Sequence, residues 1–369
     1  MHERTRQEIP IDRFDEWIRD HSDVAAVTRR EFLVPVEGAD AVIFPPTYLK
    51  PEDWPKEKEW TGYNIDRLPD GTLVCLLDSV PSQSNRMEAL FKLEKYRDLV
   101  PRVIVRVKDG LKIDLLDAGH RAADAVVRFS SLADTFRNAF RSLLEGDAGP
   151  LARIAPTSLV FGVWDSRGTR AKAPRVLRSV VRAYNVTPLH KSTIYRPPVD
   201  YKAEGLLGAL ADKVSDERLS QEGLLHSPKP VWVHGGVLCR EIRRDSILSL
   251  VALRALATQG EEDTLRLRRY ILGLALLCFT TPTEIRLREG CELVPDPDRP
   301  ADTWIVRHDG RKEHLVLPHH EQVLEYARLA AREFEFEQSL EGEFRADRLQ
   351  EALGQERRRR GRGISAGGG

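Results

Sequence analysis

The sequence lacks the signals of several protein classes. Its 369 residues include only four cysteines, scattered without C-x-x-C spacing, which argues against a zinc site and fits a reducing cytoplasm. The longest apolar run, Ile271–Phe279, is far too short to span a bilayer. The N-terminus is polar and charged and shows no secretory signal. We therefore expect a cytoplasmic protein without membrane contact.

The common catalytic motifs are also missing. The chain contains no G-x-x-x-x-G-K-[ST], G-x-G-x-x-G or G-x-S-x-G, and no paired carboxylates indicate a hydrolytic metal site. Four histidines are close in sequence without the spacing of a known metal centre: His308, His314, His319 and His320. The sequence thus predicts no catalytic residue, no metal and no cofactor.

Two other histidines have neighbours that allow an acid–base role. His190 is followed by Lys191 and, shortly after, Tyr195, and His234 precedes two glycines. Either could act on a ribose 2′-hydroxyl. The alternative is that a lone histidine near basic residues only contributes to binding.

Charge is balanced over the whole chain but not within it. The chain has 57 Lys and Arg and 57 Asp and Glu. From Arg153 to Val199, however, there are nine Lys and Arg against one acidic residue, Asp165, which gives nine minus one, a formal +8. A concentrated basic segment in a neutral protein favours a localised surface for a polyanion. The alternative is a solvated basic face on an ordinary sheet.

Small and aromatic residues accompany the cations of this segment. The pattern predicts a β-branched strand at Ser158–Val163, which ends near Gly162 and Trp164, then a Gly/Arg loop and a run of arginines between apolar residues. Phosphates need positive charge, and bases need flat side chains to stack on. Not all cations on a strand can touch one ligand, since alternate side chains face opposite ways. The candidate RNA-binding residues are Arg167, Arg170, Lys172, Arg175, Arg178, Arg182, Lys191 and Arg196.

A second donor-rich motif begins a helix predicted at residues 82–96, which follows a buried strand at Leu73–Leu77. A helix N-terminus offers unpaired N–H groups and the positive end of the helix dipole, which suit a phosphate. Amide and guanidinium side chains add donors for a sugar-phosphate backbone. The alternative is an ordinary capped helix, with Ser79 or Ser82 as the cap. The first turn carries Gln83, Ser84, Asn85 and Arg86.

The overall pattern predicts an α+β protein with an antiparallel sheet, because strands flank helices in the first two hundred residues rather than alternating strictly with them. Beyond Tyr201 the chain is expected to be mainly helical. The Pro- and Trp-rich segment 45–62 is predicted to be a loop or an inserted lobe, and the Arg/Gly-rich segment 346–369 a mobile tail. Further predicted elements are a short helix at 12–21, a strand at 24–36, a hairpin of 103–107 with 111–115 around Asp109-Gly110, and helices at 132–144, 242–257, 264–279 and 322–334.

Several segments, in order from about residue 9 to residue 295, together resemble one family. They are VPVEG-x-DAVIFPPTY (34–48), YNID (63–66), LLDSVPSQSNRME (76–88), RIAPTSLVFGVWDSRG (153–168) and R-x-x-RSVV-x-AYNVTPL (175–189). The combined set is similar to the backbone subunit of type I-G (formerly I-U) CRISPR surveillance complexes, which belongs to the RAMP superfamily.

The resemblance implies a modified RNA-recognition-motif core, ferredoxin-like, over residues 1–345. Inserted lobes would form a thumb and fingers, with 45–62 as the candidate segment, and 203–345 would be mainly helical. It implies a non-catalytic subunit that polymerises along CRISPR RNA and holds the guide for pairing with target DNA, next to other subunits of the complex. Because the guide itself reads the target sequence, donors to phosphate and ribose should outnumber base readers. The usual aromatic signature of the RNA-recognition motif is absent.

Two other functions stay open at this point. One is a RAMP-type endoribonuclease that processes CRISPR precursor RNA with a His or Tyr general acid, and the other is a free-standing RNA-binding protein. Incubation with labelled repeat RNA separates the first from a structural subunit. The mass of the RNA-bound particle separates the second, because a filament carries several copies per RNA.

Overall fold

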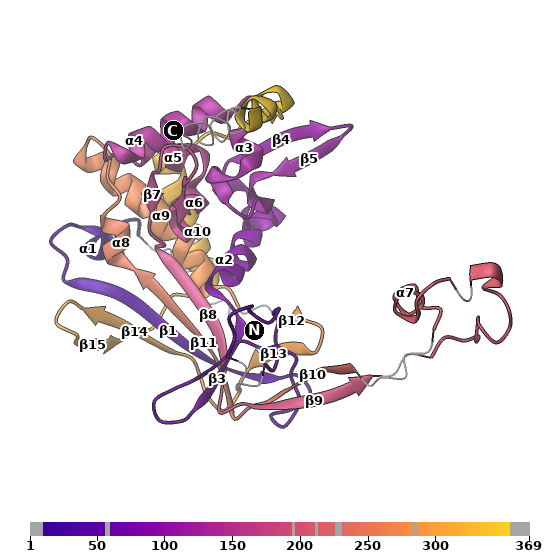
Figure 1. Ribbon diagram of the computed structural model, residues 1–369. Helices are drawn as coiled ribbons and strands as arrows, with labels where there is room; N and C mark the ends of the chain where they lie inside the picture. Colours follow the sequence, from indigo (N-terminus) through magenta and orange to yellow (C-terminus); the bar gives the residue numbers. More distant parts are fainter. Residues whose placement is uncertain are drawn as a thin grey trace, which may run out of the picture.

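The computed structural model describes residues 10–55, 60–193, 196–210, 213–225, 231–282 and 286–354. Its centre is a curled nine-stranded sheet with the order β12-β13-β1-β11-β8-β3-β2, in which β14, paired with β15, shares the outer edge of β1 with β13 (Figure 1). Its described strand pairs are antiparallel, so the α+β prediction is confirmed. The strands are β1 (Val24–Pro35), β2 (Ile65–Arg67), β3 (Leu73–Asp78), β8 (Leu177–Tyr184), β11 (Glu241–Ser249), β12 (Arg286–Arg288), β13 (Cys291–Pro295), β14 (Asp302–Arg307) and β15 (Lys312–His314).

Helices pack on one face of this sheet and leave the other open (Figure 1). The alternation in β11 shows this asymmetry: every second residue from Ile242 to Leu248 is buried, and the intervening ones are half-buried. The helices are α1 (Asp15–Ile18), α2 (Val80–Glu88), α3 (Ala125–Arg128), α4 (Ala133–Leu144), α5 (Gly149–Ile154), α6 (Pro156–Phe161), α8 (Leu250–Arg254), α9 (Glu261–Thr280) and α10 (His320–Phe334), with 3₁₀ turns η1 (Ala89–Lys92), η2 (Glu94–Leu99), η3 (Leu115–Asp117) and η4 (Arg121–Ala123).

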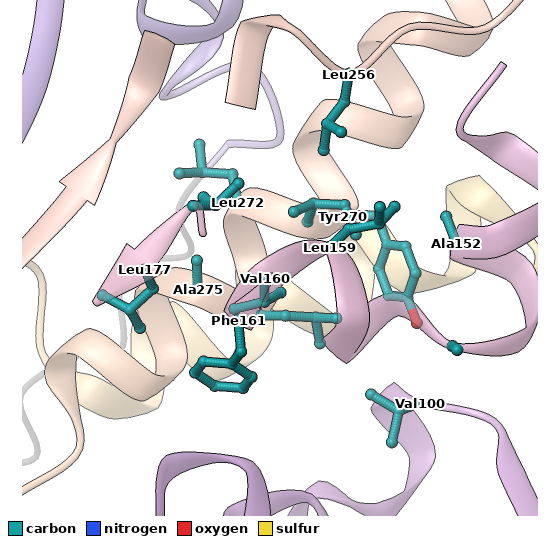
Figure 2. Close-up of a cluster of buried hydrophobic side chains, with 14 of the residues drawn as sticks. Val100, Ala152, Leu159, Val160, Phe161, Leu177, Leu256, Tyr270, Leu272 and Ala275 are labelled. Carbon is teal, nitrogen blue, oxygen red and sulfur yellow. The ribbon is translucent and has the colours of Figure 1, made fainter. Parts of the chain in front are cut away.

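Helix α9 forms the centre of the core. Every residue from Tyr270 to Phe279 is buried, as expected of a helix that is apolar on all sides. Figure 2 shows side chains of α6, among them Leu159 and Phe161, beside Tyr270 of α9. The Tyr270 hydroxyl donates to the carbonyl of Leu99 at 2.8 Å, which satisfies the one polar group in this contact.

The strand predicted at Ser158–Val163 is wrong. Residues Pro156–Phe161 form helix α6, all six of them buried, and only β6 (Val163–Trp164) is extended. A short apolar run is compatible with a buried strand or a buried helix. Here Pro156 stands in the first turn, where a missing N–H costs nothing, and packing against α9 decides for the helix.

The helix predicted at 242–257 is also wrong over its first half. β11 extends to Ser249, whose hydroxyl accepts from the Ala252 N–H at 3.2 Å and begins the short helix α8. The segment 203–345 is accordingly not mainly helical, since strands β10 to β16 lie in it along with helices. The helix predicted at 82–96 is shorter than expected, because α2 ends at Glu88 and the residues that follow form the 3₁₀ turns η1 and η2.

The remaining predicted elements are present, some with different bounds. α1 is shorter than 12–21, whereas β1, α4, α9 and α10 agree with their predicted ranges within a few residues. The hairpin of β4 (Arg102–Lys108) and β5 (Leu111–Asp114) turns at Asp109 and Gly110, both with positive φ (44° and 82°). β4 also pairs in parallel with β16 (Ser339–Glu343). Of the predicted tail, residues 346–354 are helical and the rest lies outside the described residues.

A two-stranded arm projects from the body (Figure 1). It consists of β9 (Thr187–Thr193) and β10 (Val231–Leu238), and its far end carries η5 (Gly208–Leu210) and α7 (Asp216–Gln221). Its base is tied to the body, because Val237 and Ile43 exchange backbone hydrogen bonds of 2.8 and 3.0 Å and the Gly236 N–H donates to the buried Tyr63 hydroxyl at 2.8 Å.

The segment 45–62 has no helix or strand among its described residues, as predicted, and it lies near the base of the arm. Thr47 forms a bridge with Tyr63, and the Thr61 carbonyl is hydrogen-bonded with His234 of β10 at 2.8 Å. Trp54 and Trp60 pack edge to face with ring centroids 4.8 Å apart. The long projecting element is therefore the β9–β10 arm, while a thumb role for 45–62 stays a prediction.

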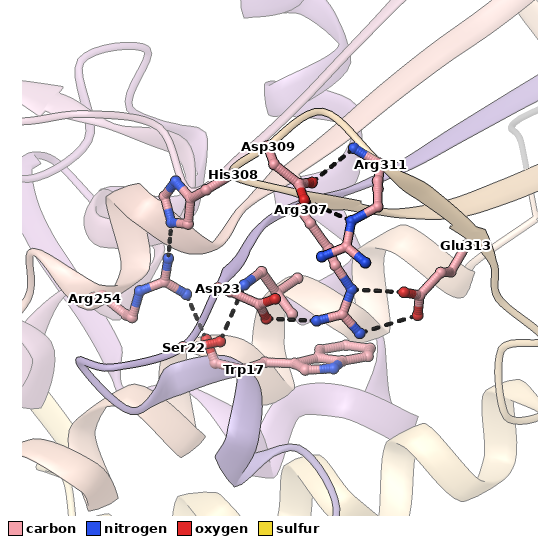
Figure 3. Close-up of polar contacts among 10 residues, drawn as sticks. Trp17, Ser22, Asp23, Arg254, Arg307, His308, Asp309, Arg311 and Glu313 are labelled. Atoms are coloured by element: carbon pink, nitrogen blue, oxygen red, sulfur yellow. Dashed lines mark hydrogen bonds and ion pairs between the residues drawn. The ribbon is translucent and has the colours of Figure 1, made fainter.

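An ion-pair network joins the β14–β15 hairpin to the N-terminal segment. Figure 3 shows Arg307 between Asp23 and Glu313, with distances of 2.5 Å to Asp23 Oδ1 and 2.6 Å to Glu313 Oε1. Arg254 donates to the carbonyl of Trp17 at 2.7 Å and to His308 Nε2 at 3.2 Å. These contacts fix the outer edge of the sheet and engage His308.

Candidate nucleic-acid interface

The cations of the basic segment differ from other arginines in their partners. Elsewhere arginines commonly pair with carboxylates, as Arg269 does with Asp15 at 2.6 Å and Arg328 with Asp98 at 3.2 Å. A cation without such a partner keeps its charge available for an external anion. Within the described part of the chain, no acidic partner is found for Arg167, Arg170, Lys172, Arg175, Arg178, Arg182 or Lys191.

The single acidic residue of the segment holds the loop between β6 and β7 (Lys172–Ala173). Asp165 is 8% exposed and its Oδ2 accepts from the Thr169 N–H at 2.6 Å and the Thr169 hydroxyl at 2.8 Å. A Cβ at Gly168 would lie 2.4 Å from this carboxylate, so only glycine fits there. The loop therefore exposes Arg167 and Arg170, the latter with φ of +66°.

Strand β8 presents two of the candidate arginines on the open face of the sheet. Its core-facing residues, from Leu177 to Ala183 in alternation, are buried, whereas Arg178 is exposed and Arg182 half-buried. Four residues of strand separate these two arginines by about 13 Å. Because they are four residues apart, Arg178 and Arg182 share one face of the strand, and this face points away from the helices.

Neighbouring arginines on this open face have carboxylate partners, unlike those of β8. Opposite Arg182 lies Arg243 of β11, whose guanidinium stacks on the Tyr184 ring at 3.6 Å from the centroid. Arg243 also pairs with Glu241 at 3.2 Å, and Arg30 of β1 pairs with Asp245 at 2.7 Å. Uncompensated positive charge on this face is therefore concentrated at β8. Sequence reasoning missed Tyr184 and Arg243, because only the pairing of β8 with β11 brings them together.

The motif at the start of α2 is largely internal. Ser79 caps the helix by accepting from the Ser82 N–H at 3.3 Å. Gln83 and Ser84 are buried, and Gln83 donates to Asp78 Oδ2 at 2.7 Å while its carbonyl accepts from the Ser179 hydroxyl at 3.1 Å. These contacts favour the capped-helix interpretation for Gln83 and Ser84, because their polar groups already have partners inside the protein.

Asn85 and Arg86 are more accessible than their neighbours. Arg86 donates to Asp78 Oδ2 at 3.1 Å and to the Leu287 carbonyl at 2.6 Å. Asn85 is exposed, and its side-chain oxygen accepts from Arg121 at 3.2 Å. A role of Asn85 and Arg86 at a nucleic-acid backbone stays a prediction.

A buried ion pair connects α2 to the turn η4 near the basic segment. Glu88 and Arg121 are 2% and 6% exposed, with 2.8 Å between Glu88 Oε2 and Arg121 Nε. Burial raises the pKa of Glu88 and lowers the pKa of Arg121. The positive charge of Arg175 also lowers the pKa of Arg121, which places a cation of the basic segment near this pair.

The arm carries the last candidates. Lys191 lies exposed on β9, and Arg196 is exposed just beyond it. His190 and His234 stand directly opposite each other in the β9–β10 register, so their side chains share one side of the arm. Tyr195 lies outside the described residues.

The clustered histidines are dispersed by the fold. His314 packs edge to face on Trp304 at 5.3 Å, His319 begins α10, and His320 is hydrogen-bonded with Tyr96 at 2.8 Å. In the part of the chain that the structure describes, no group of three His, Cys, Asp or Glu residues could hold a metal ion. The described helices also include none with the length and apolarity to cross a membrane.

Comparison with known families gives one match. A family model described as CRISPR-associated protein GSU0053 matches residues 27–188. This range runs from β1 into the start of β9 and includes the α2 motif, the β6–β7 loop and β8. No curated protein matches the chain.

Proposed function

We propose that this chain, whose residues 27–188 match the family model described as CRISPR-associated protein GSU0053, is a non-catalytic, guide-RNA-binding structural subunit of a type I-G surveillance complex. Several copies would line one CRISPR RNA and hold the guide for pairing with target DNA, next to other subunits. The observation that carries the proposal is the series of cations from Arg167 to Lys191 without acidic partners among the described residues.

The distribution of these cations suits a backbone rather than a base sequence. They lie on a loop, on the open face of a strand and on the arm, and they are guanidinium or ammonium groups that contact phosphates. Because guide recognition is delegated to base pairing, a backbone-holding surface is what such a subunit needs. An antiparallel sheet with helices on one face also agrees with the RRM-like core that the proposal includes.

The arm supports the assembly part of the proposal. Copies that line an RNA make a head-to-tail contact that does not close into a ring, and this requires two different faces on each copy. The β9–β10 arm reaches far from the body (Figure 1), so it could contact the next copy while its base stays tied to Ile43 and Tyr63.

The RNA-binding part is tested by removing the two arginines of β8. Arg178→Gln/Arg182→Gln should weaken binding to guide RNAs of unrelated sequence, and the slope of log K against log salt should fall by about 1.4, at about 0.7 per lost contact with a single strand. The matched control is Arg106→Gln/Arg328→Gln, which removes two arginines that have carboxylate partners. Equal slopes for the two variants would refute the assignment.

The assembly part is tested by shortening the arm. Replacing residues 196–225 by a short Gly/Ser linker should leave a folded protein that binds short RNA but forms no regular multimers on a full-length guide. Particle mass measured with and without RNA reports the outcome. Regular multimers of the shortened protein would show that the arm does not make the contact between copies.

One observation favours a second function, the processing endoribonuclease. His190 and His234 face each other across the arm with Lys191 alongside, an arrangement that could serve acid–base chemistry on a ribose hydroxyl. Wild-type protein and His190→Ala/His234→Ala are incubated with labelled repeat RNA in the presence of EDTA. We expect no cutting by either, whereas cutting by wild type alone would overturn the non-catalytic role.

A further inference from the structure

A groove lined by arginines lies between α3, α4 and the β6–β7 loop. Its volume is about 510 Å³, which is within the range of ligand sites. Phe136 and Phe140 of α4, both 2% exposed, and Val127 of α3 form an apolar floor. Four arginines from three separate parts of the chain line it: Arg128, Arg137, Arg141 and Arg167.

Most of the charge in this groove is uncompensated. Arg137 pairs with Asp134 at 2.5 Å, but no acidic partner is found for Arg128, Arg141 or Arg167 within the described part of the chain. The one carboxylate in the lining, Asp165, already accepts hydrogen bonds from Thr169 and holds its own loop. The groove thus has three cations without an acidic partner among the described residues, which leaves their charge available to an external anion.

Arg128 adds an unused donor at the site. Its guanidinium lies 4.6 Å from the centroid of the Phe129 ring, and its Nε is buried without a hydrogen-bond partner. The terminal nitrogens of Arg128 also have no hydrogen-bond partner among the described residues, and a phosphate oxygen in the groove would supply one. The exposed Leu144 and the guanidinium planes of the lining arginines offer surface on which a base can stack.

We infer that this groove binds one nucleotide of single-stranded RNA, with the phosphate at the arginine rim and the base against Leu144 and a guanidinium plane. The inference rests on the proposed function and extends it, because Arg128 and Arg141 lie outside the basic segment. The β6–β7 loop belongs both to the groove and to the basic segment, because it carries Arg167 into the groove and Arg170 on its exposed surface. The RNA path would therefore pass from the groove over this loop.

The test compares two double variants on the full chain. Arg128→Gln/Arg141→Gln should lower the salt slope of RNA binding by about 1.4, whereas Arg97→Gln/Arg266→Gln, which removes two arginines with acidic partners on other surfaces, should leave it unchanged. Thermal unfolding confirms that each variant is folded. In addition, RNA that carries 4-thiouridine should crosslink to residues 133–144 of wild type and less to the groove variant.

A third variant changes geometry without charge. Gly168→Ala forces its Cβ against the Asp165 carboxylate and so displaces Arg167, which should also weaken binding and crosslinking. Gly119→Ala is the matched control, because nothing lies within 4 Å of the added Cβ and Gly119, like Gly168, does not have a positive φ. Equal binding by Gly168→Ala and wild type would count against the groove.

The outcomes separate the groove from the proposed function. If Arg178→Gln/Arg182→Gln weakens RNA binding and the groove variant does not, the groove inference is overturned and the proposed function stands. If wild type binds no RNA, the proposed function fails, and thermal unfolding with millimolar uridine monophosphate then tests the groove directly. A stabilisation of wild type that the groove variant lacks supports the site, and no stabilisation overturns it.

Discussion

Replacing Asp78 by alanine should strongly destabilise the protein, because its carboxylate is buried, with 1% of the residue exposed, and is the acceptor for several donors. Its carboxylate accepts from the Ser82 hydroxyl and from Gln83 Nε2, both at 2.7 Å, and from Arg86 Nε at 3.1 Å. Arg288 lies 3.7 Å away. The change therefore removes the acceptor that three side chains of α2 share, and it also removes the carboxylate nearest to Arg288 of β12.

The magnitude follows from the groups left behind. A buried donor without a partner costs about 1–3 kcal/mol, and here this applies to the amide of Gln83. Breaking a buried ion pair costs about 3–5 kcal/mol, but Arg86 is 25% exposed, so water recovers part of this loss. We expect a decrease of about 3 kcal/mol in the free energy of unfolding, a large share of the usual 5–15 kcal/mol.

Urea unfolding followed by circular dichroism measures this decrease. Asp66→Ala on β2 is the matched control, because Asp66 is exposed and a surface change of this kind is usually within about 0.5 kcal/mol. If both variants unfold at the same urea concentration, the Asp78 network does not hold α2 and the reasoning is wrong. Asn85→Ala removes an acceptor of the buried Arg121 and should cost about 1–3 kcal/mol. Its RNA affinity is therefore measured where urea unfolding shows the variant to be folded, and a uniform loss then reports a backbone contact of Asn85.

Three further changes test other parts of the molecule. Leu159→Ala in the buried helix α6 should cost about 2–5 kcal/mol in unfolding free energy, and a cost below 1 kcal/mol would contradict the packing of α6 on α9. Gly236→Ala, at φ of +88° with a Cβ 2.8 Å from the Ile43 carbonyl oxygen, should loosen the arm and speed its proteolysis relative to wild type. Burial, and then the charge of Lys95, lower the pKa of His320 from its ordinary value of 6.5, so the unfolded chain binds the proton more readily. The stability contribution of neutral His320 is therefore complete above pH 6.5 and is lost as the pH falls below it, and wild type should lose more stability between pH 7.5 and 6 than His320→Gln does.

The parts of the fold that local patterns specify could be predicted from the sequence. β1 has its alternation, α9 and α10 have helical periodicity, and Asp109-Gly110 has the backbone freedom of a two-residue hairpin turn. The basic segment was visible for the same reason, since charge is counted along the chain. Its Gly/Arg loop also lies where the composition placed it, whereas the strand predicted before the loop was wrong and strand β8 after it was not predicted.

Only the tertiary structure decided the features that depend on distant partners. Residues 156–161 are helical because they are surrounded by α9 and its neighbours, and 241–249 are extended because β1 and β8 pair with them on both sides. Whether a cation is available depends on which carboxylates lie near it in space. For the same reason the sequence could not show that Arg128, Arg137 and Arg141 lie with Arg167 in one groove. Gln83 looked accessible in the sequence, but it is buried and hydrogen-bonded to Ser179 of β8. Sequence patterns report local conformational preference, but burial and ion pairing are set by contacts between segments far apart in the chain.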